Sequence, residues 1–435
     1  MSHHHDHLAP SHLPPLGRAA LTDELHARSI LPLYGEYYIH HLAYSGPRAL
    51  GLAYVEQLHE YVNEEAPSQL SKHEIFKLGG ALIKWEQHTE FFSITVFEQD
   101  RERPFQRAVL PLTKLASDLE LEMLVDMRLL VQRSHRPPND CPEEFRDYFN
   151  DVSLCGVSIS GGGGSYFTDY RLSGEDQATF HLLLDHGMTP HQLGRQVVRV
   201  IEVENYRVLA MLGYHYTQSL HQRLAELENG TQGLISMIGA TAEGEGRELL
   251  DEVISLSMRA EQLIAESQFR INATRAYTQL LYERIESLRG VKINVLRDLS
   301  GFMDRRLTPS VRTVESFGDR LLRLSARLDR SSNLIRTRVD VKIEEQNSAL
   351  LRSMDRRARL QLRLQSTVEG LSVIALSYYS LGLIGYLVTP IAKYIDLSPK
   401  LVTGGFALPV LLTIYWVTQR IHSMSHMKRD AHSTD

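Results

Sequence analysis

The sequence predicts an α+β (or α/β) head, a long α-helical stalk and two C-terminal transmembrane helices. Three observations lead to this class. Strand-forming runs mixed with short helical stretches occupy the first 185 residues. Apolar residues spaced three or four apart then fill 190–365. Two charge-free runs, 370–391 and 401–419, follow close together. A single soluble fold does not account for all three.

We expect five segments along the chain. They are a disordered His/Pro-rich tail over 1–16, the head over 17–185, the stalk over 186–365, a two-helix transmembrane hairpin over 366–423 and a short tail over 424–435. The first seventeen residues, MSHHHDHLAPSHLPPLG, have no apolar core, which is unlike a signal peptide. We therefore expect the bulk of the chain to stay in the cytoplasm.

In the head, β-forming residues predict strands over 36–44 and 84–98, and a strand pair within 154–173. Helical stretches are expected at 47–62, 68–80, 113–117 and 142–149. The glycine run SGGGGS (160–165) has no following Gly-Lys-Ser/Thr and no helix pattern, so it predicts a hairpin turn rather than a phosphate loop.

Three long helices are expected in the stalk. Thr189-Pro190 is typical of a helix start, and Asn229-Gly230 of a helix end. A second helix spans about 248–287 and stops near Arg289-Gly290, and a third runs from about 309 into the membrane. An apolar stripe on a helix needs a partner in water. The stripe could be covered by other helices of the same chain, or by a second copy of the chain in a homo-oligomer that packs as a coiled coil.

The charge-free runs predict a membrane hairpin because a helix needs about 20 apolar residues to cross a bilayer. Residues 305–365 hold fifteen Lys/Arg and seven Asp/Glu, a net charge of +8 in a chain of net charge −6. Both outer flanks are more basic than the loop between the runs, which predicts an inner (cell) membrane protein with both termini cytoplasmic. The arginines expected at the interface with anionic lipid headgroups are Arg352, Arg356, Arg357, Arg359 and Arg363. The basic stretch lacks interleaved aromatic residues, so no nucleic-acid partner is expected.

The middle of the first span carries a hydroxyl cluster of Ser377, Tyr378, Tyr379 and Ser380. Serine hydroxyls in a membrane helix commonly bond the carbonyl one turn back, and Gly382 and Gly385 would allow close helix packing. The other interpretation is that the four residues line a water-filled path in an oligomer.

The head offers a few polar residues for a site. His26 and Arg28 follow a capped helix start, LTDEL, and Glu86, His88 and Glu90 alternate along a predicted strand and would share one face. Each pattern is also typical of an ordinary polar surface. The chain has no nucleophile elbow, zincin helix or Walker pattern, so we expect no catalytic residues, no cofactor, no metal site and no enzyme.

Several motifs resemble a known family. In order they are LTDELHARSILPL, KWEQHTEFFSITVF, YFTDYRL, IEVENYRVLAML, RINATRAYTQLL and RTRVDVKIEEQNSALLRSMDRRARLQLRLQSTVEGLSVIALSYYSLGL. Over roughly residues 13–390 they resemble a bacterial domain-of-unknown-function family of uncharacterised membrane-anchored proteins. The family's HAR element is usually followed by Pro-Phe, where this chain has Ser29-Ile30. The resemblance implies a membrane anchor and no particular biochemistry.

The architecture is also similar to that of CorA-type magnesium channels, where a stalk helix runs into the first of two C-terminal spans. That likeness implies a pentamer, a pore along the first span and a transported cation. The Gly-Met-Asn signature of those channels is missing, and Gly385-Tyr386-Leu387 stands near its place. The leading hypothesis is thus a CorA-like ion channel or transporter without the usual filter. The alternative is a membrane-anchored scaffold or sensor that binds a ligand or protein through the head.

Overall fold

The computed structural model describes residues 30–62, 72–99, 109–135, 137, 140–149, 153–174, 177–240, 246–294, 296–394 and 399–430. The chain divides into two compact units, residues 1–332 and residues 333–435. Helix α7 (Thr308–Tyr394) contributes to both of them.

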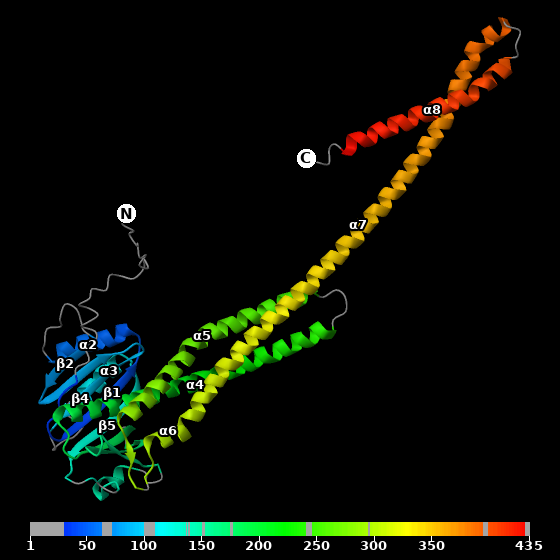
Figure 1. The fold of residues 1–435 in the computed structure, drawn as a ribbon. Coiled ribbons are helices and arrows are strands. Elements are labelled where there is room, and N and C mark those ends of the chain that lie inside the picture. The colour runs from blue at the N-terminus through cyan, green and yellow to red at the C-terminus, as the bar shows by residue number, and fades with distance from the viewer. Residues whose placement is uncertain are drawn as a thin grey trace, which may run out of the picture. The chain divides into compact units, whose positions relative to one another are not determined.

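The first unit is built on a mixed sheet (Figure 1). In the described residues its strands are ordered β2-β3-β4-β1-β5-β8-β7-β6-β9. All neighbours are antiparallel except β5 and β8, which are parallel. The strands are β1 (Tyr37–Ser45), β2 (His73–Leu78), β3 (Ala81–Gln87), β4 (Phe91–Glu98), β5 (Glu122–Arg133), β6 (Cys155–Ile159), β7 (Gly164–Ser173), β8 (Ala178–Asp185) and β9 (Val291–Lys292).

Helices cover both faces of this sheet. Helices α2 (Arg48–Val62) and α3 (Val109–Asp118) pack on one face around Leu42, Trp85 and Phe92. The 3₁₀ helix η1 (Glu143–Tyr148) belongs to a smaller apolar cluster with β7 and β8. The larger core contains residues from the opposite face and from α4 (Pro190–Ala240), α5 (Gly246–Ser287) and α6 (Leu299–Arg306). The mostly antiparallel sheet makes this an α+β domain, although helices pack on both of its faces.

The sequence located most of the head elements. The strand over 36–44, the helices at 47–62 and 113–117, and the hairpin around SGGGGS are all present. Ser160, Gly161 and Gly162 have positive φ values of 55°, 67° and 95°, which glycine adopts without a steric cost at the last two positions. The expected helix over 68–80 is wrong, because its described part contains β2 and the Gly79-Gly80 turn that joins it to β3. The run 84–98 contains two strands, with a turn at His88–Glu90.

The long helices differ from expectation mainly at one end. Helix α4 continues ten residues past Gly230, because this glycine is a packing position rather than a helix end. A Cβ atom at residue 230 would lie 3.0 Å from the Leu256 side chain on α5. The beginning of α7 packs with these two helices and is tied to α4 by an Arg320–Glu228 ion pair of 2.6 Å. The stripe on this part of α7 is therefore covered within the chain, since Leu321, Leu324 and Leu328 are buried.

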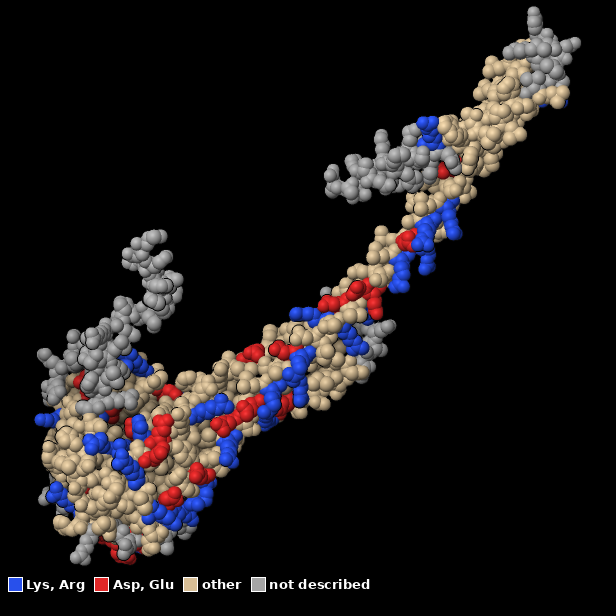
Figure 2. Space-filling model, in the orientation of Figure 1, with Lys and Arg blue, Asp and Glu red and all other residues tan. Residues whose placement is uncertain are grey.

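The second unit consists of the remainder of α7 and of α8 (Pro399–Asp430). Among the described residues, one helix, Thr308–Pro390, contains an 18-residue window long and apolar enough to cross a membrane, and 6% of that window is buried. Thr403–Thr418 is a shorter apolar helix. Figure 2 shows blue Lys and Arg atoms along α7 giving way to an almost uncharged tan surface over the end of α7 and the described start of α8. By length and composition, this unit is compatible with membrane association.

Candidate functional site

The register of three strands builds a polar strip on the sheet face that α4 covers. His41 on β1 is opposite Thr95 on β4, and Thr95 is opposite Lys84 on β3. The next row in the strip pairs Ser93 with Glu86. Side chains two residues apart on a strand point to the same face, so these five polar groups face α4 together. Their neighbours Ile83, Trp85, Ile94 and Val96 point into the apolar cluster beneath α2 and α3.

Helices α4 and α5 close a cavity over this strip. Its volume is about 310 Å³. The α4 residues that line it recur every three or four positions, which places them on one side of the helix: Arg195, Val198, Arg199, Ile201, Glu202 and Asn205. Arg284 and Ser287 come from the end of α5. Four of the strip residues are deeply buried, with exposed fractions of 1% for His41 and Ser93, 3% for Thr95 and 6% for Lys84.

His41 is at the centre of a hydrogen-bonded chain. Its Nδ1 lies 2.8 Å from the Thr95 hydroxyl and its Nε2 lies 2.9 Å from Asn205 Oδ1. Burial lowers the pKa of His41 to about 4, so the imidazole is neutral at neutral pH. A neutral ring with Nε2–H donating to Asn205 accepts the Thr95 hydroxyl proton at Nδ1. The same order of hydroxyl, imidazole and amide occurs in nucleophilic triads, although direct cross-strand pairing of His41 with Thr95 is sufficient to explain the bond.

Two ion pairs lie beside this series of hydrogen bonds. Lys84 Nζ lies 2.9 Å from Glu86 Oε1, and His73 approaches the same oxygen at 3.3 Å. Burial opposes ionisation of Glu86, but the bond from His73 and the charge of Lys84 lower its pKa to about 2. Across the cavity, Arg284 Nε lies 2.5 Å from Glu202 Oε2. Both carboxylates are therefore already paired with cations.

A second buried network lies beside the cavity on the same sheet face. Glu204, 1% exposed, binds Arg207 at 2.6 Å and accepts a bond from Thr179 at 3.2 Å. His181 joins Thr179 to the Tyr166 hydroxyl, which lies 2.6 Å from its Nδ1. Burial lowers the pKa of His181 to about 4. This network joins α4 to β8 and β7, and among the described residues it does not line the cavity.

The structure brings together only part of the head site predicted from sequence. Glu86 and His88 line the cavity. Glu90 lies in the turn after β3 and binds Arg270 at 2.8 Å, while Tyr277 donates to it at 3.1 Å, so its role is to hold α5. His26 and Arg28 lie outside the described residues. Among the described residues, no group of three or more His, Cys, Asp and Glu side chains is placed to hold a metal ion.

The hydroxyl cluster in the second unit is arranged mostly as an ordinary helix surface. Ser377 is buried and its hydroxyl donates to Val373 O at 2.6 Å. Tyr378 and Tyr379 are 75% and 69% exposed and contact each other edge to face. Ser372 bonds Val368 O at 2.8 Å in the same way as Ser377. These bonds satisfy both serine hydroxyls within one helix.

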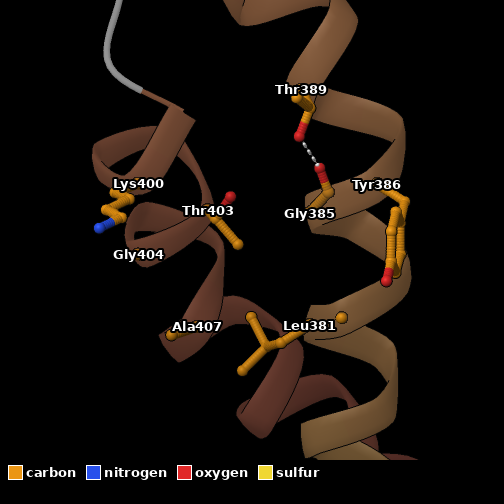
Figure 3. Close-up of a pocket in the computed structure, with 9 residues that line it drawn as sticks. Leu381, Gly385, Tyr386, Thr389, Lys400, Thr403, Gly404 and Ala407 are labelled. Atoms are coloured by element: carbon orange, nitrogen blue, oxygen red, sulfur yellow. Dashed lines mark hydrogen bonds between the residues drawn. The ribbon is translucent and has the colours of Figure 1, made fainter.

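A shallow groove of about 550 Å³ separates the ends of α7 and α8 (Figure 3). Small side chains line it, since Gly382 and Gly385 of α7 face Thr403, Gly404 and Ala407 of α8. A Cβ atom at Gly385 would lie 3.7 Å from the Thr403 methyl group, whereas one at Gly382 would meet nothing within 4 Å. Of the two glycines expected to allow close helix packing, Gly385 therefore lies at a contact with α8 and Gly382 does not. Tyr386 also borders the groove, and its side chain is 83% exposed.

The predicted interface arginines are all exposed on α7. Arg359 pairs with Asp355 one turn back at 2.8 Å, and Arg352 donates to Ser348 O at 3.2 Å. An exposed pair at i, i+4 contributes little to stability. Their positive charge therefore stays available to a surface of opposite sign.

Sequence reasoning missed most of the cavity. Ser93 and Thr95 alternate with Phe92, Ile94 and Val96, and this alternation was the available signal. On α4, polar residues spaced four, three and three apart within RQVVRVIEVEN indicate one polar side on an otherwise apolar helix. Neither pattern by itself says that the two surfaces meet.

Comparison with known proteins agrees with the family resemblance. A search of curated proteins and a search of solved structures each found no significant match. The CorA-type likeness therefore stays a prediction. The family model described as "Protein of unknown function (DUF3422)" matches residues 15–425, so the chain belongs to this domain-of-unknown-function family.

Proposed function

We propose that the protein is a membrane-anchored sensor or scaffold whose head binds a small ligand in the cavity between the polar strip and α4. The observation that carries this proposal is a cavity of about 310 Å³ lined by polar and charged groups, of which His41, Lys84, Ser93, Thr95 and Asn205 are buried. Pockets for small molecules start at about 300 Å³ and place a few polar groups among apolar ones. Apolar residues would have filled this part of the core at a lower desolvation cost.

The anchor is supported by the second unit. Its apolar residues are exposed along α7 and α8, and the arginines of 352–363 precede them on α7. In water such a surface is unfavourable, whereas lipid chains would cover it. Basic residues outside both apolar helices favour cytoplasmic termini and contact with anionic lipid at the inner membrane.

A cavity-filling variant tests the ligand proposal. Val198 lines the cavity on α4, so Val198→Trp would occupy the space, whereas Met258→Trp places the same indole on an exposed site of α5. Native mass spectrometry of the detergent-extracted protein is expected to show a retained small molecule in wild type and Met258→Trp and none in Val198→Trp. Spectra without an added mass in the wild type would contradict the proposal.

The ion-channel hypothesis stays a prediction from the sequence. Ser377 and Ser372 need no water-filled path, because their hydroxyls bond their own helix. If a pore exists, Ser377→Leu or Ser380→Leu should block ion flux into liposomes while the protein still assembles. Absence of flux from the wild type would favour the sensor or scaffold.

A further inference from the structure

Most polar groups of the cavity are already satisfied by one another. Lys84 is paired with Glu86, Arg284 with Glu202, and His41 with both Thr95 and Asn205. The Ser287 hydroxyl donates to Arg284 O within its own helix. These groups form the walls, and they have little remaining capacity to hold a ligand.

Three groups differ from the rest. The Ser93 hydroxyl is 1% exposed and has no hydrogen-bond partner in the described residues. Arg195 and Arg199 line the same cavity, and no hydrogen bond or ion pair joins either guanidinium to a described residue. Buried polar groups such as the Ser93 hydroxyl are nearly always paired in native proteins, whereas Arg199 is half-buried and Arg195 is exposed to solvent. All three can donate and the two arginines cannot accept, so the missing partner is rich in acceptors.

The charges around the cavity indicate the sign and the magnitude of the charge on that missing partner. Its lining contains four cations, Lys84, Arg195, Arg199 and Arg284, and two anions, Glu86 and Glu202, which gives a formal net charge of +2 when histidines are not counted. Burial and repulsion from Arg195, Arg284 and Arg289 lower the pKa of Arg199, so a bound anion would relieve this crowding. A bound dianion would neutralise the net positive charge of the lining residues.

The spacing of the two arginines indicates a compact group rather than two separate charges. Arg195 and Arg199 are one helical turn apart, about 5–6 Å between Cβ atoms, so both can reach a single group. Two planar guanidinium forks and one hydroxyl match the several oxygens of a phosphate. A dicarboxylate would place its second charge away from the first, where the cations Lys84 and Arg284 are already paired.

We propose that the cavity binds a phosphate monoester, with Arg195, Arg199 and the Ser93 hydroxyl as the ligands of its phosphate group. This inference rests on the proposed ligand-binding function and specifies its chemistry. The phosphate group belongs to a small soluble ester or to the headgroup of a phosphomonoester lipid. Both sources present the same dianion to the same three donors.

Calorimetric titration of the full-length protein in nanodiscs tests this assignment. The probes are inorganic phosphate, glycerol 3-phosphate and succinate, at constant ionic strength in discs without anionic lipid. Arg195→Gln and Arg199→Gln should each raise the dissociation constant for glycerol 3-phosphate at least ~10-fold, and Ser93→Ala about fivefold. Arg223→Gln is the matched control, because Arg223 is on the same helix but pairs with Glu266 at 2.8 Å and does not line the cavity. Its affinity should equal that of the wild type.

A second set of discs distinguishes the source of the phosphate. If phosphatidic acid in the discs competes with glycerol 3-phosphate, and Arg199→Gln abolishes that competition, the natural ligand is the lipid headgroup. If phosphatidic acid does not compete, the natural ligand is the soluble ester. Tighter binding of succinate than of phosphate, or equal affinity of Arg199→Gln and Arg223→Gln, would overturn the inference. If native mass spectra still show a molecule that Val198→Trp expels, the ligand-binding proposal survives that failure; if they show none, both fail.

Discussion

At the residue scale, two buried neutral histidines make the head sensitive to mild acid. Unfolded histidine binds a proton near pH 6.5, whereas His41 and His181 do so only near pH 4 because they are buried. The unfolded state therefore takes up more protons between these values, so stability is full above pH 6.5 and decreases toward pH 4. The shift corresponds to about 3 kcal/mol per histidine.

Urea unfolding followed by the fluorescence of Trp85, in a Trp416→Phe background, measures this loss. Between about pH 7 and pH 4.5 the midpoint should fall steeply, and His41→Gln should make the fall shallower. His191→Gln is the control, since His191 is exposed at the start of α4. A pH dependence that His41→Gln leaves unchanged would mean that His41 does not titrate in this window.

The buried Glu204–Arg207 pair gives a second prediction at this scale. Burial opposes ionisation of Glu204, but Arg207 outweighs it and holds the pKa of the carboxyl below its usual value. Glu204→Gln leaves the Arg207 charge without its partner in a largely buried position and should cost about 3 kcal/mol in urea unfolding. Glu266→Gln, which breaks the exposed pair with Arg223, should cost less than about 1 kcal/mol. Equal costs would show that the Glu204–Arg207 pair is no more important than a surface pair.

At the element scale, the approach of α4 to α5 depends on glycine. A Cβ atom at Gly213 would lie 2.0 Å from Thr274 Oγ1 on α5, and Thr274 itself bonds the α4 carbonyl of Ala210 at 3.4 Å. We expect Gly213→Ala to push the helices apart and to cost about 1–3 kcal/mol.

Gly233→Ala on the same helix is the comparison, because a Cβ atom there meets nothing within 4 Å. This substitution should stabilise the protein by up to about 1 kcal/mol through helix propensity alone. Thermal unfolding of both variants measures the contrast. Similar shifts in Tm for the two would show that α5 does not approach α4 as closely as described.

At the scale of the whole molecule, the prediction concerns where the protein is found. If the proposed anchor is right, full-length protein should sediment with membranes and require detergent for extraction, because lipid would cover the exposed apolar residues of α7 and α8. Deletion of 366–423 should release the chain into the supernatant. Recovery of the full-length protein in the supernatant without detergent would contradict the membrane anchor, the predicted topology and the ion-channel hypothesis together.

The assembly state is a separate prediction at the same scale. Leu350, Leu351, Met354 and Leu360 of α7 are exposed within the second unit, so they favour a homo-oligomer. Light scattering of the detergent-extracted complex is expected to give a multiple of the chain mass, 49.5 kDa. A monomeric mass would contradict the oligomer and would leave no room for a path between two helices.

The sequence by itself determined the parts that depend on local pattern. Apolar spacing and the Thr189-Pro190 start gave the long helices, because periodicity and capping are properties of neighbouring residues. The glycine run gave the β6–β7 hairpin for the same reason. Gly230 shows the limit, since whether a glycine ends a helix or admits a neighbour depends on Leu256, 26 residues away on another helix.

Only the tertiary structure decided the candidate site. Glu86 and His88 were found from sequence because they are two residues apart, but Arg199, Ser93 and His41 come from α4, β4 and β1. Their meeting depends on strand order and on which sheet face α4 covers, and no short segment encodes either. The structure also separated Glu90 from its neighbours, because the turn after β3 directs it toward Arg270 on α5.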